Sequence, residues 1–305
     1  MRVAVVDIGT NSTRLLVADV DDRRVNEVVR RTTVTRLGRG VDTSGQLSGE
    51  AIEDVCRVVG EYAAHYEELG AEAVSAIATS AVRDAENSAV FLAELRERFA
   101  LDARILDGAD EAQLTYAGAC AGRPLDGRTV VVDIGGGSTE LIVCDGPGIA
   151  FHASLQVGVV RHTERYLTAD PPEPAQLDKL AADVREQVEA ALEEAPASRV
   201  QAGIAVAGTP TSLAAIEQRL DPYDPERVHG HSLDLGATQR MLSLLAAQPL
   251  AERRQVTGLD PDRAPVIVAG VVILVQVMRA FGLTEIEVSE HDILWGAALE
   301  AGARS

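Results

Sequence analysis

Short apolar runs and amphipathic stretches alternate along the first part of the chain, up to about residue 121. Apolar runs separated by polar turns predict strands at 2–8, 13–20, 25–35, 73–79 and 103–106. After Ser48, which suits a helix N-cap, apolar residues recur at helical spacing and predict a helix to about Leu69. Two further helices are expected, one that ends near Phe99 and one at 110–121.

The same order of elements starts again near residue 128. Strands are predicted at 129–133, 138–144, 149–157, 202–207 and 285–288, and helices at about 175–195, 236–256, 262–281 and 292–302. A glycine turn is expected at 207–215 and polar loops at 220–235. This alternation predicts an α/β chain with two related domains that face each other across a cleft. The expected boundaries are 1–124 plus about 290–305 for the first domain and 125–289 for the second.

A short motif occurs at corresponding places in the two halves. Residues 5–17 read VVDIGTNSTRLLV and residues 131–143 read VVDIGGGSTELIV, and the two align without a gap. Glycine lets the backbone come close to a ligand, and several bare N–H groups at such a turn form a binding site for an anion. The alternative is a pair of ordinary hairpins, but the shared register of Asp, Ser and Thr favours two phosphate-binding turns. The motif is not a dinucleotide-binding fingerprint, because a strand rather than a helix follows the glycines.

Composition and charge narrow the partners and the compartment. The net charge of −19 argues against nucleic acid or an anionic membrane as a partner, although a few arginines and backbone amides can still hold a small anion. The three cysteines have neither paired nor metal-like spacing, which predicts reduced thiols in a cytoplasmic protein. No signal peptide is visible, and the most apolar segment, 264–278, is shorter than the roughly 20 residues that span a bilayer.

Six motifs occur in a recognisable order along the chain: DIGTNSTRLL, TSAVRDAEN, LDGADEAQLTYAGA, VVDIGGGSTEL, VGVVRHTERYL and VAGTPTSLAA. Together they resemble the successive motifs of the Ppx/GppA phosphatases, which are exopolyphosphatases and guanosine pentaphosphate phosphohydrolases. The resemblance covers roughly residues 1–303 and implies two actin-like (ribonuclease H-like) domains. It also implies the short form of the family, since a longer form carries an additional helical domain.

The resemblance places the catalytic glutamate of the family at Glu111, within GADEA. Chemistry supports this role, because hydrolysis of a phosphoanhydride needs a base that orients and deprotonates water. The alternative is that Asp110 and Glu111 only complement the dipole at the start of a helix.

The same resemblance implies the remaining site residues. Asp133 and Glu140 are expected to hold Mg²⁺ or Mn²⁺, with Asp7 at the corresponding place in the first motif, where a turn-capping role is the alternative. Arg83 is expected to clamp phosphate, since a guanidinium suits bidentate contacts. The other phosphate-binding residues expected are Gly9, Thr10, Asn11, Ser12, Gly135, Gly136, Gly137, Ser138, Gly208 and Thr209.

Three features leave a choice open or depart from the family pattern. Arg14 follows the first motif, and strand alternation allows it to face either the site or solvent. His229 and His231 are more typical of a surface loop than of a metal pair. The family motif RAD reads RAP here, with Pro265 at its third position, and the motif GLREG reads HDILWG at 291–296.

The expected function is an Mg²⁺-dependent exopolyphosphatase that releases terminal phosphate from inorganic polyphosphate. Hydrolysis of pppGpp to ppGpp is the alternative within the same chemistry, because both substrates present a terminal phosphoanhydride. Two other classes remain: an ATP-dependent kinase for a small molecule, and a non-catalytic sensor of a phosphorylated nucleotide or polyphosphate. A homodimer is an open question, because nothing in the sequence exposes an interface.

Overall fold

A computed structural model describes the chain except residues 22–23, 122–126, 147, 195–198 and 304–305. The chain divides into two compact units, Met1–Arg123 with Asp292–Ser305, and Pro124–His291. Each unit is an α/β structure built on one mixed sheet. None of the helices in the described ranges is both long and apolar enough to cross a membrane.

The first unit is built on a five-stranded sheet in the order β3-β2-β1-β4-β5. Its strands are β1 (Arg2–Ile8), β2 (Ser12–Asp21), β3 (Arg24–Val34), β4 (Ala73–Ala78) and β5 (Ala103–Ile105). Its helices are α1 (Val41–Ser44), α2 (Gly49–Glu68), α3 (Ser80–Asp84), α4 (Ser88–Phe99), α5 (Gly108–Ala119) and α13 (Ile293–Ala303). β1, β2 and β3 pair antiparallel, whereas β4 and β5 continue the sheet in parallel with β1.

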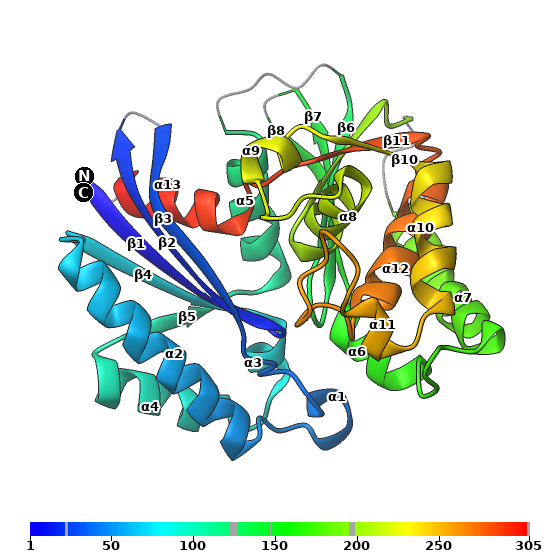
Figure 1. Ribbon diagram of the computed structural model, residues 1–305. Helices are drawn as coiled ribbons and strands as arrows, with labels where there is room; N and C mark the ends of the chain where they lie inside the picture. Colours follow the sequence, from blue (N-terminus) through cyan, green and yellow to red (C-terminus); the bar gives the residue numbers. More distant parts are fainter. Residues whose placement is uncertain (22–23, 122–126, 147, 195–198, 304–305) are drawn as a thin grey trace. The chain divides into compact units, whose positions relative to one another are not determined.

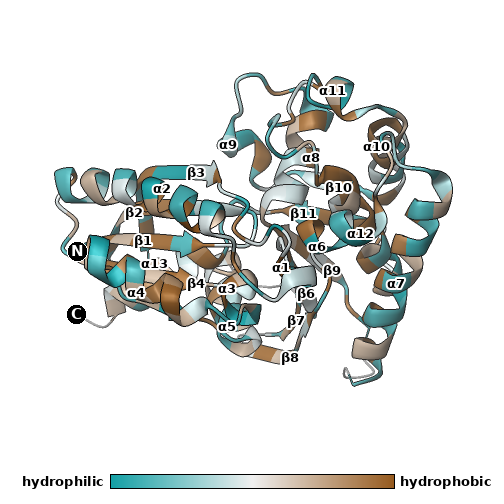
Figure 2. Ribbon diagram, turned by 90° about the horizontal axis from the view of Figure 1, so that it is seen from below, coloured by the Kyte–Doolittle hydropathy of each residue, from teal (hydrophilic) through white to brown (hydrophobic). Residues whose placement is uncertain are grey.

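Strand alternation divides the residues of this sheet between two cores. Ala4, Val6 and Ile8 of β1 pack with α2 and α4. Val3 and Val5 face the other side, where the cluster includes residues of α5 and α13. Figure 1 shows α13, in red, beside the first strands although it comes from the other end of the sequence. The edge strand β3 carries many hydrophilic residues along its length, as Figure 2 shows.

The second unit repeats this order and adds one edge strand. Its strands are β6 (Thr129–Ile134), β7 (Thr139–Asp145), β8 (Gly148–Leu155), β9 (Ala202–Val206), β10 (Ser232–Asp234) and β11 (Glu285–Val288). Read from β8, the order is β8-β7-β6-β9-β11-β10, with β9 and β11 parallel to β6 and β10 antiparallel at the edge. The predicted class, an α/β chain with two actin-like domains, is confirmed.

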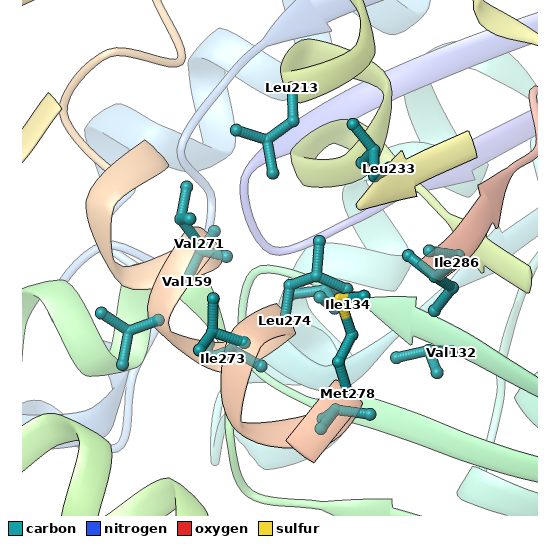
Figure 3. Packing of buried hydrophobic residues seen from close by; sticks show 14 of the residues in the cluster. Val132, Ile134, Val159, Leu213, Leu233, Val271, Ile273, Leu274, Met278 and Ile286 are labelled. Atoms are coloured by element: carbon teal, nitrogen blue, oxygen red, sulfur yellow. The ribbon is translucent and has the colours of Figure 1, made fainter. Parts of the chain in front are cut away.

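The core of the second unit lies on one face of its sheet. The helices of this unit are α6 (Val159–Tyr166), α7 (Pro174–Glu193), α8 (Gly208–Gln218), α9 (Pro225–Val228), α10 (Leu235–Ala247), α11 (Leu250–Arg253) and α12 (Ile267–Ala280). Val132 and Ile134 of β6 face this core, and Figure 3 shows them in one cluster with Val159 of α6 and residues of α12. Asp133 therefore lies on the opposite face of the sheet.

Several predicted elements differ from the structure. The glycine turn expected at 207–215 is wrong, because α8 already begins at Gly208. The single helix expected at 236–256 is two helices, which are separated by Gln248 and Pro249. The helix expected from residue 262 begins at Ile267, two residues after Pro265. The sequence predicts no helix at α6, although α6 covers most of the motif VGVVRHTERYL.

Candidate active site

The two glycine turns have the same backbone geometry. In the first, the Gly9 N–H donates to the Ser12 carbonyl at 3.0 Å, and in the second the Gly135 N–H donates to the Ser138 carbonyl at 3.0 Å. Each turn joins a central strand to its antiparallel neighbour, and the strand pairs have matching registers. The internal repeat in the sequence is therefore a repeat in structure.

A segment after the third strand holds the carbonyl groups of the first turn. The Gly38 N–H donates to the Thr10 carbonyl at 2.8 Å, and the Arg36 N–H donates to the Asn11 carbonyl at 2.9 Å. The Thr10 hydroxyl accepts from the Ala81 N–H at the start of α3. With these carbonyls bound from one side, the turn is suited to present its N–H groups to an anion.

The second turn is held by the start of a helix. The N–H groups of Val159 and Val160 donate to the carbonyls of Gly135 and Gly136 at 3.0 and 2.8 Å. The Arg161 side chain donates from Nε to the Gly137 carbonyl at 2.9 Å. α6 therefore uses its first N–H groups on the turn itself, and a guanidinium lies beside the three glycines.

The aspartate before the first turn is neutralised by an arginine. Asp7 pairs in register with Arg14, whose Nε lies 2.7 Å from Asp7 Oδ2, and the same guanidinium binds Asp292 at the start of α13. Alternation places Asp7 and Arg14 on the α13 face of the sheet, which resolves the direction of Arg14 that the sequence left open. Although burial opposes the charged form, Asp292 and Asp7 raise the pKa of Arg14.

One carboxylate oxygen of Asp7 accepts no hydrogen bond from the described residues. The residue is 2 % exposed, and its Oδ1 is buried without a hydrogen-bond partner among the described residues. Burial raises the pKa of the Asp7 carboxyl, while Arg14 acts in the opposite direction. A metal role for Asp7 stays a prediction.

The aspartate before the second turn is opposite another carboxylate. Asp133 pairs in register with Glu140, so both side chains lie on the same face of the sheet, away from the α12 core. Glu140 is 2 % exposed and accepts a hydrogen bond from the Ser154 hydroxyl at 2.9 Å. Like charges directly opposite on two strands repel each other. A metal site made only of protein ligands needs at least three suitable side chains close together. Within the described ranges, no group of three His, Cys, Asp or Glu side chains meets this requirement.

The predicted base and the predicted phosphate clamp contact each other. Glu111 lies in the first turn of α5, is 5 % exposed and forms an ion pair with Arg83. Arg83 comes from α3 and also donates to the Leu106 carbonyl at 2.8 Å. Because the other end of α3 binds the Thr10 hydroxyl, the first turn, Arg83 and Glu111 form one connected group in the first unit.

The predicted pair Gly208 and Thr209 lies at the start of α8. β9 runs parallel to β6 with Val206 beside Asp133, so both glycine segments lie at the carboxyl edge of the same sheet. A Cβ on Gly208 would stand 1.3 Å from Nη1 of Arg263, so this guanidinium lies directly against the glycine. The Thr209 side chain packs against Gly270 of α12, which leaves the backbone of Thr209 rather than its hydroxyl for an anion.

Three residues beside the predicted site were missed by sequence reasoning. Gly158 fits against the second turn so closely that a Cβ would lie 2.4 Å from the Gly136 carbonyl oxygen. Arg161 binds the same turn, and Arg263 covers Gly208. Gly158 and Arg161 stand in the motif VGVVRHTERYL, where a glycine at a strand end followed by arginine was the available signal.

Two units of one topology, each with an aspartate before a glycine turn, define a protein of the actin-like α/β class. Residues 16–297 match the model of the Ppx/GppA phosphatase family. The chain is 36 % identical to exopolyphosphatase 2 of Mycobacterium tuberculosis over 98 % of each chain, and 32 % identical to exopolyphosphatase 1 of Mycobacterium bovis over 94 % of this chain and 84 % of the relative. The protein belongs to the Ppx/GppA phosphatase family and is a hydrolase.

Solved structures support the same placement. An exopolyphosphatase from Cytophaga hutchinsonii superposes with a TM-score of 0.89 at 26 % identity and covers 98 % of both chains. A Ppx/GppA family member from Aquifex aeolicus superposes with a TM-score of 0.82 at 29 % identity, over 100 % of this chain and 98 % of that one.

Proposed function

We propose that this protein is an exopolyphosphatase that removes the terminal phosphate of inorganic polyphosphate with the help of Mg²⁺. The observation that carries the proposal is the ion pair of the buried Glu111 with Arg83, which is joined through α3 to the first glycine turn. The names of full-length relatives in the family support polyphosphate as the substrate.

Glu111 serves as the base in this reaction. Its carboxylate takes a proton from water, and the water oxygen forms a bond to the terminal phosphorus. The bond from that phosphorus to the bridging oxygen breaks, and the shortened chain leaves with the electron pair. Arg83 lies against Glu111, and in this proposal its guanidinium binds the phosphoryl oxygens near the attacking water.

Asp133 and Glu140 suit a divalent cation. Two carboxylates in cross-strand register, one of them buried, repel each other, and a cation beside them would offset that repulsion. Mg²⁺ is commonly bound by one or two carboxylates together with phosphate oxygens, so a cluster of three protein ligands is not required. When bound, the metal ion neutralises charge that develops on the phosphoryl oxygens.

The glycine turns contribute backbone donors. The carbonyl groups of both turns are occupied by the segments behind them, so the N–H groups are preorganised for phosphate oxygens. Arg161 adds positive charge at the second turn in a protein whose net charge is −19.

The test is phosphate release with Mg²⁺ from short polyphosphate, long polyphosphate, pppGpp and ATP. Glu111→Gln should lower release by roughly two to four orders of magnitude, because glutamine keeps the shape but removes the base. Asp110→Asn is the matched control, since it removes one charge from the same turn of α5 without touching the pair with Arg83. Substrate binding, measured by calorimetry, should survive in both variants.

Each outcome decides one part of the proposal. Preference for pppGpp would reject polyphosphate as the substrate and keep the chemistry. Tight binding without release by the wild type would reject the enzyme and make the protein a sensor. An equal loss of activity in Asp110→Asn and Glu111→Gln would reject Glu111 as the base.

A further inference from the structure

A buried histidine lies behind the second glycine turn and has no part in the chemistry above. His162 of α6 is fully buried, and its Nε2 lies 2.9 Å from Oδ2 of Asp183 on α7. Its Nδ1 accepts the Gly158 N–H at 3.3 Å. Since a backbone N–H can only donate, Nδ1 carries no proton, and the ring proton resides on Nε2 and points to Asp183.

The histidine fixes one residue from two sides. Its backbone N–H donates to the Gly158 carbonyl at 2.9 Å, while its ring accepts from the N–H of the same glycine. Gly158 is the N-cap of α6 and has no side chain with which to bind the first turn of the helix. The His162 ring therefore binds the N–H of the N-cap residue from within the helix, as the glutamate or glutamine of a capping box does.

The same glycine sets the position of the turn. The Cα of Gly158 packs on the backbone of Gly136 and Gly137, and the two residues that follow it donate to the turn carbonyls. Figure 3 shows Val159, the first of these two, in the apolar core with Ile134 at the end of β6. A shift of Gly158 would therefore displace the N–H groups that face a phosphate.

We propose that His162, oriented by Asp183, is a positioning residue that sets the geometry of the turn Gly135–Ser138 through Gly158. The neutral ring with its proton on Nε2 is the form that does so. The inference rests on the proposed function, in which this turn binds phosphate. The first unit holds its own turn through a loop that contains Gly38 and has no histidine in this place, so the device belongs to the second unit.

The surroundings of the ring keep it neutral. Burial lowers the pKa of His162, while the hydrogen bond and the charge of Asp183 act in the opposite direction. Arg161 and Arg165 of the same helix also lower the pKa, and Tyr166 contributes a ring 5.6 Å away. The residues that α12 buries in this core carry no charge.

The lowered pKa of His162 determines how its contribution to stability changes with pH. Because the folded-state pKa lies below the ordinary value near 6.5, the unfolded chain takes up the proton first as the pH falls. The contribution of His162 is present above pH 6.5 and is lost as the pH falls through the folded-state value. A protonated Nδ1 can no longer accept the Gly158 N–H, so the turn should loosen on the acid side.

Three substitutions separate the two bonds of the ring. His162→Asn keeps an acceptor near the position of Nδ1, His162→Gln keeps a donor near the position of Nε2, and His162→Phe keeps only the ring shape. If the bond to Gly158 is what matters, the Phe and Gln variants should lose about ten- to hundredfold in kcat/KM, mostly through KM, because the turn holds phosphate in the ground state too. The Asn variant should stay within about threefold of the wild type.

The control and the second readout keep the test independent of fold and of activity. Val184→Ala removes buried packing one residue from Asp183 without touching a polar bond of α6, so it reproduces a loss of stability alone. Hydrogen exchange of the amides of Gly136–Ser138 and Gly158–Arg161 should speed up in His162→Gln and not in Val184→Ala. On the acid side the kcat/KM of the wild type should fall relative to that of His162→Asn.

Opposite results overturn the proposal. It is wrong if His162→Gln matches Val184→Ala in both amide exchange and kcat/KM. It is also wrong if kcat/KM falls in the same way at acid pH in the wild type and in His162→Asn. If His162→Phe does not fold, the comparison of Asn with Gln still decides, since these side chains differ by one methylene group. If the wild type releases no phosphate at all, the proposed function fails, and amide exchange alone decides the role of His162.

Discussion

The two glycine hairpins share turn, register and strand order but differ in the residue opposite the aspartate. Arg14 faces Asp7 in the first hairpin, and Glu140 faces Asp133 in the second. An arginine neutralises the first carboxylate and ties it to α13, whereas the aspartate of the second hairpin faces another carboxylate. One position of a repeated motif therefore gives the first hairpin an ion pair and the second a pair of like charges, on which the proposed cation site rests.

The largest effect should come from breaking the first hairpin's ion pair. Arg14→Met leaves Asp7 and Asp292 buried without their shared cation, so we expect a loss of about 3–5 kcal/mol in the free energy of unfolding, measured by urea denaturation.

The control for this loss is a second arginine of the same sheet. Arg2→Met removes a guanidinium whose pair with Asp19 is about a third to a half exposed, and it should cost at most about 1 kcal/mol. Similar losses in the two variants would show that the pair of Arg14 is no more than an ordinary surface contact.

The second-largest effect should come from a substitution in the second hairpin, and it should lower activity rather than stability. Glu140→Gln removes one of the two opposed charges, so phosphate release should drop about a hundredfold, or about 2.7 kcal/mol in the barrier. The Mg²⁺ concentration for half-maximal activity should rise by at least about tenfold, as it does when the support of a metal site is weakened.

Asp145→Asn, at the exposed end of the same strand, removes the same charge and should leave both quantities unchanged. A loss of activity in Glu140→Gln with an unaltered Mg²⁺ titration would count against a cation at this hairpin.

Much of this architecture could be predicted because the signals are local. A strand that ends in aspartate, a glycine turn and a second strand form a hairpin from a dozen consecutive residues, so both copies are visible in the sequence. The order of strands in the two units follows from the repeat. The carboxylate Glu111 was found through its motif, although its contact with Arg83 needed the structure.

The errors, the choices left open and the omissions arise where distant residues or helix ends decide. The segment GTPTS reads as a turn, yet proline is tolerated in the first turn of a helix, where its missing N–H has no partner to lose. The direction of Arg14 depends on Asp292, which is 278 positions away in the sequence. Gly158 matters through its close contact with the backbone of the second turn, and His162 matters through ring contacts with Gly158 and Asp183, which residue type alone does not reveal.

The smallest effect should separate the two glycines that support the turns. In Gly38→Ala, the new methyl group meets Cγ2 of Thr10, where the built Cβ lies 2.2 Å away, whereas in Gly158→Ala it meets the backbone of Gly136 and Gly137 at about the same closeness. We expect losses of about 1–3 kcal/mol for both, with the larger loss at Gly158, because a side chain can give way more easily than a backbone.

A second substitution tests this difference directly. Thr10→Ser removes the clashing methyl group but keeps the hydroxyl that accepts the Ala81 N–H, so it should restore most of the stability of Gly38→Ala. The Gly158 N-cap is extended, with φ −144° and ψ 156°, so alanine meets no conformational penalty there, and the whole cost is the contact with the turn backbone. Rescue by Thr10→Ser, measured by thermal unfolding, would show that the first turn is held through side chains as well as backbone. Failure of that rescue would mean that Gly38, like Gly158, is limited by more than a side chain that can be trimmed, and the contrast between the two turns would reduce to the charge opposite each aspartate.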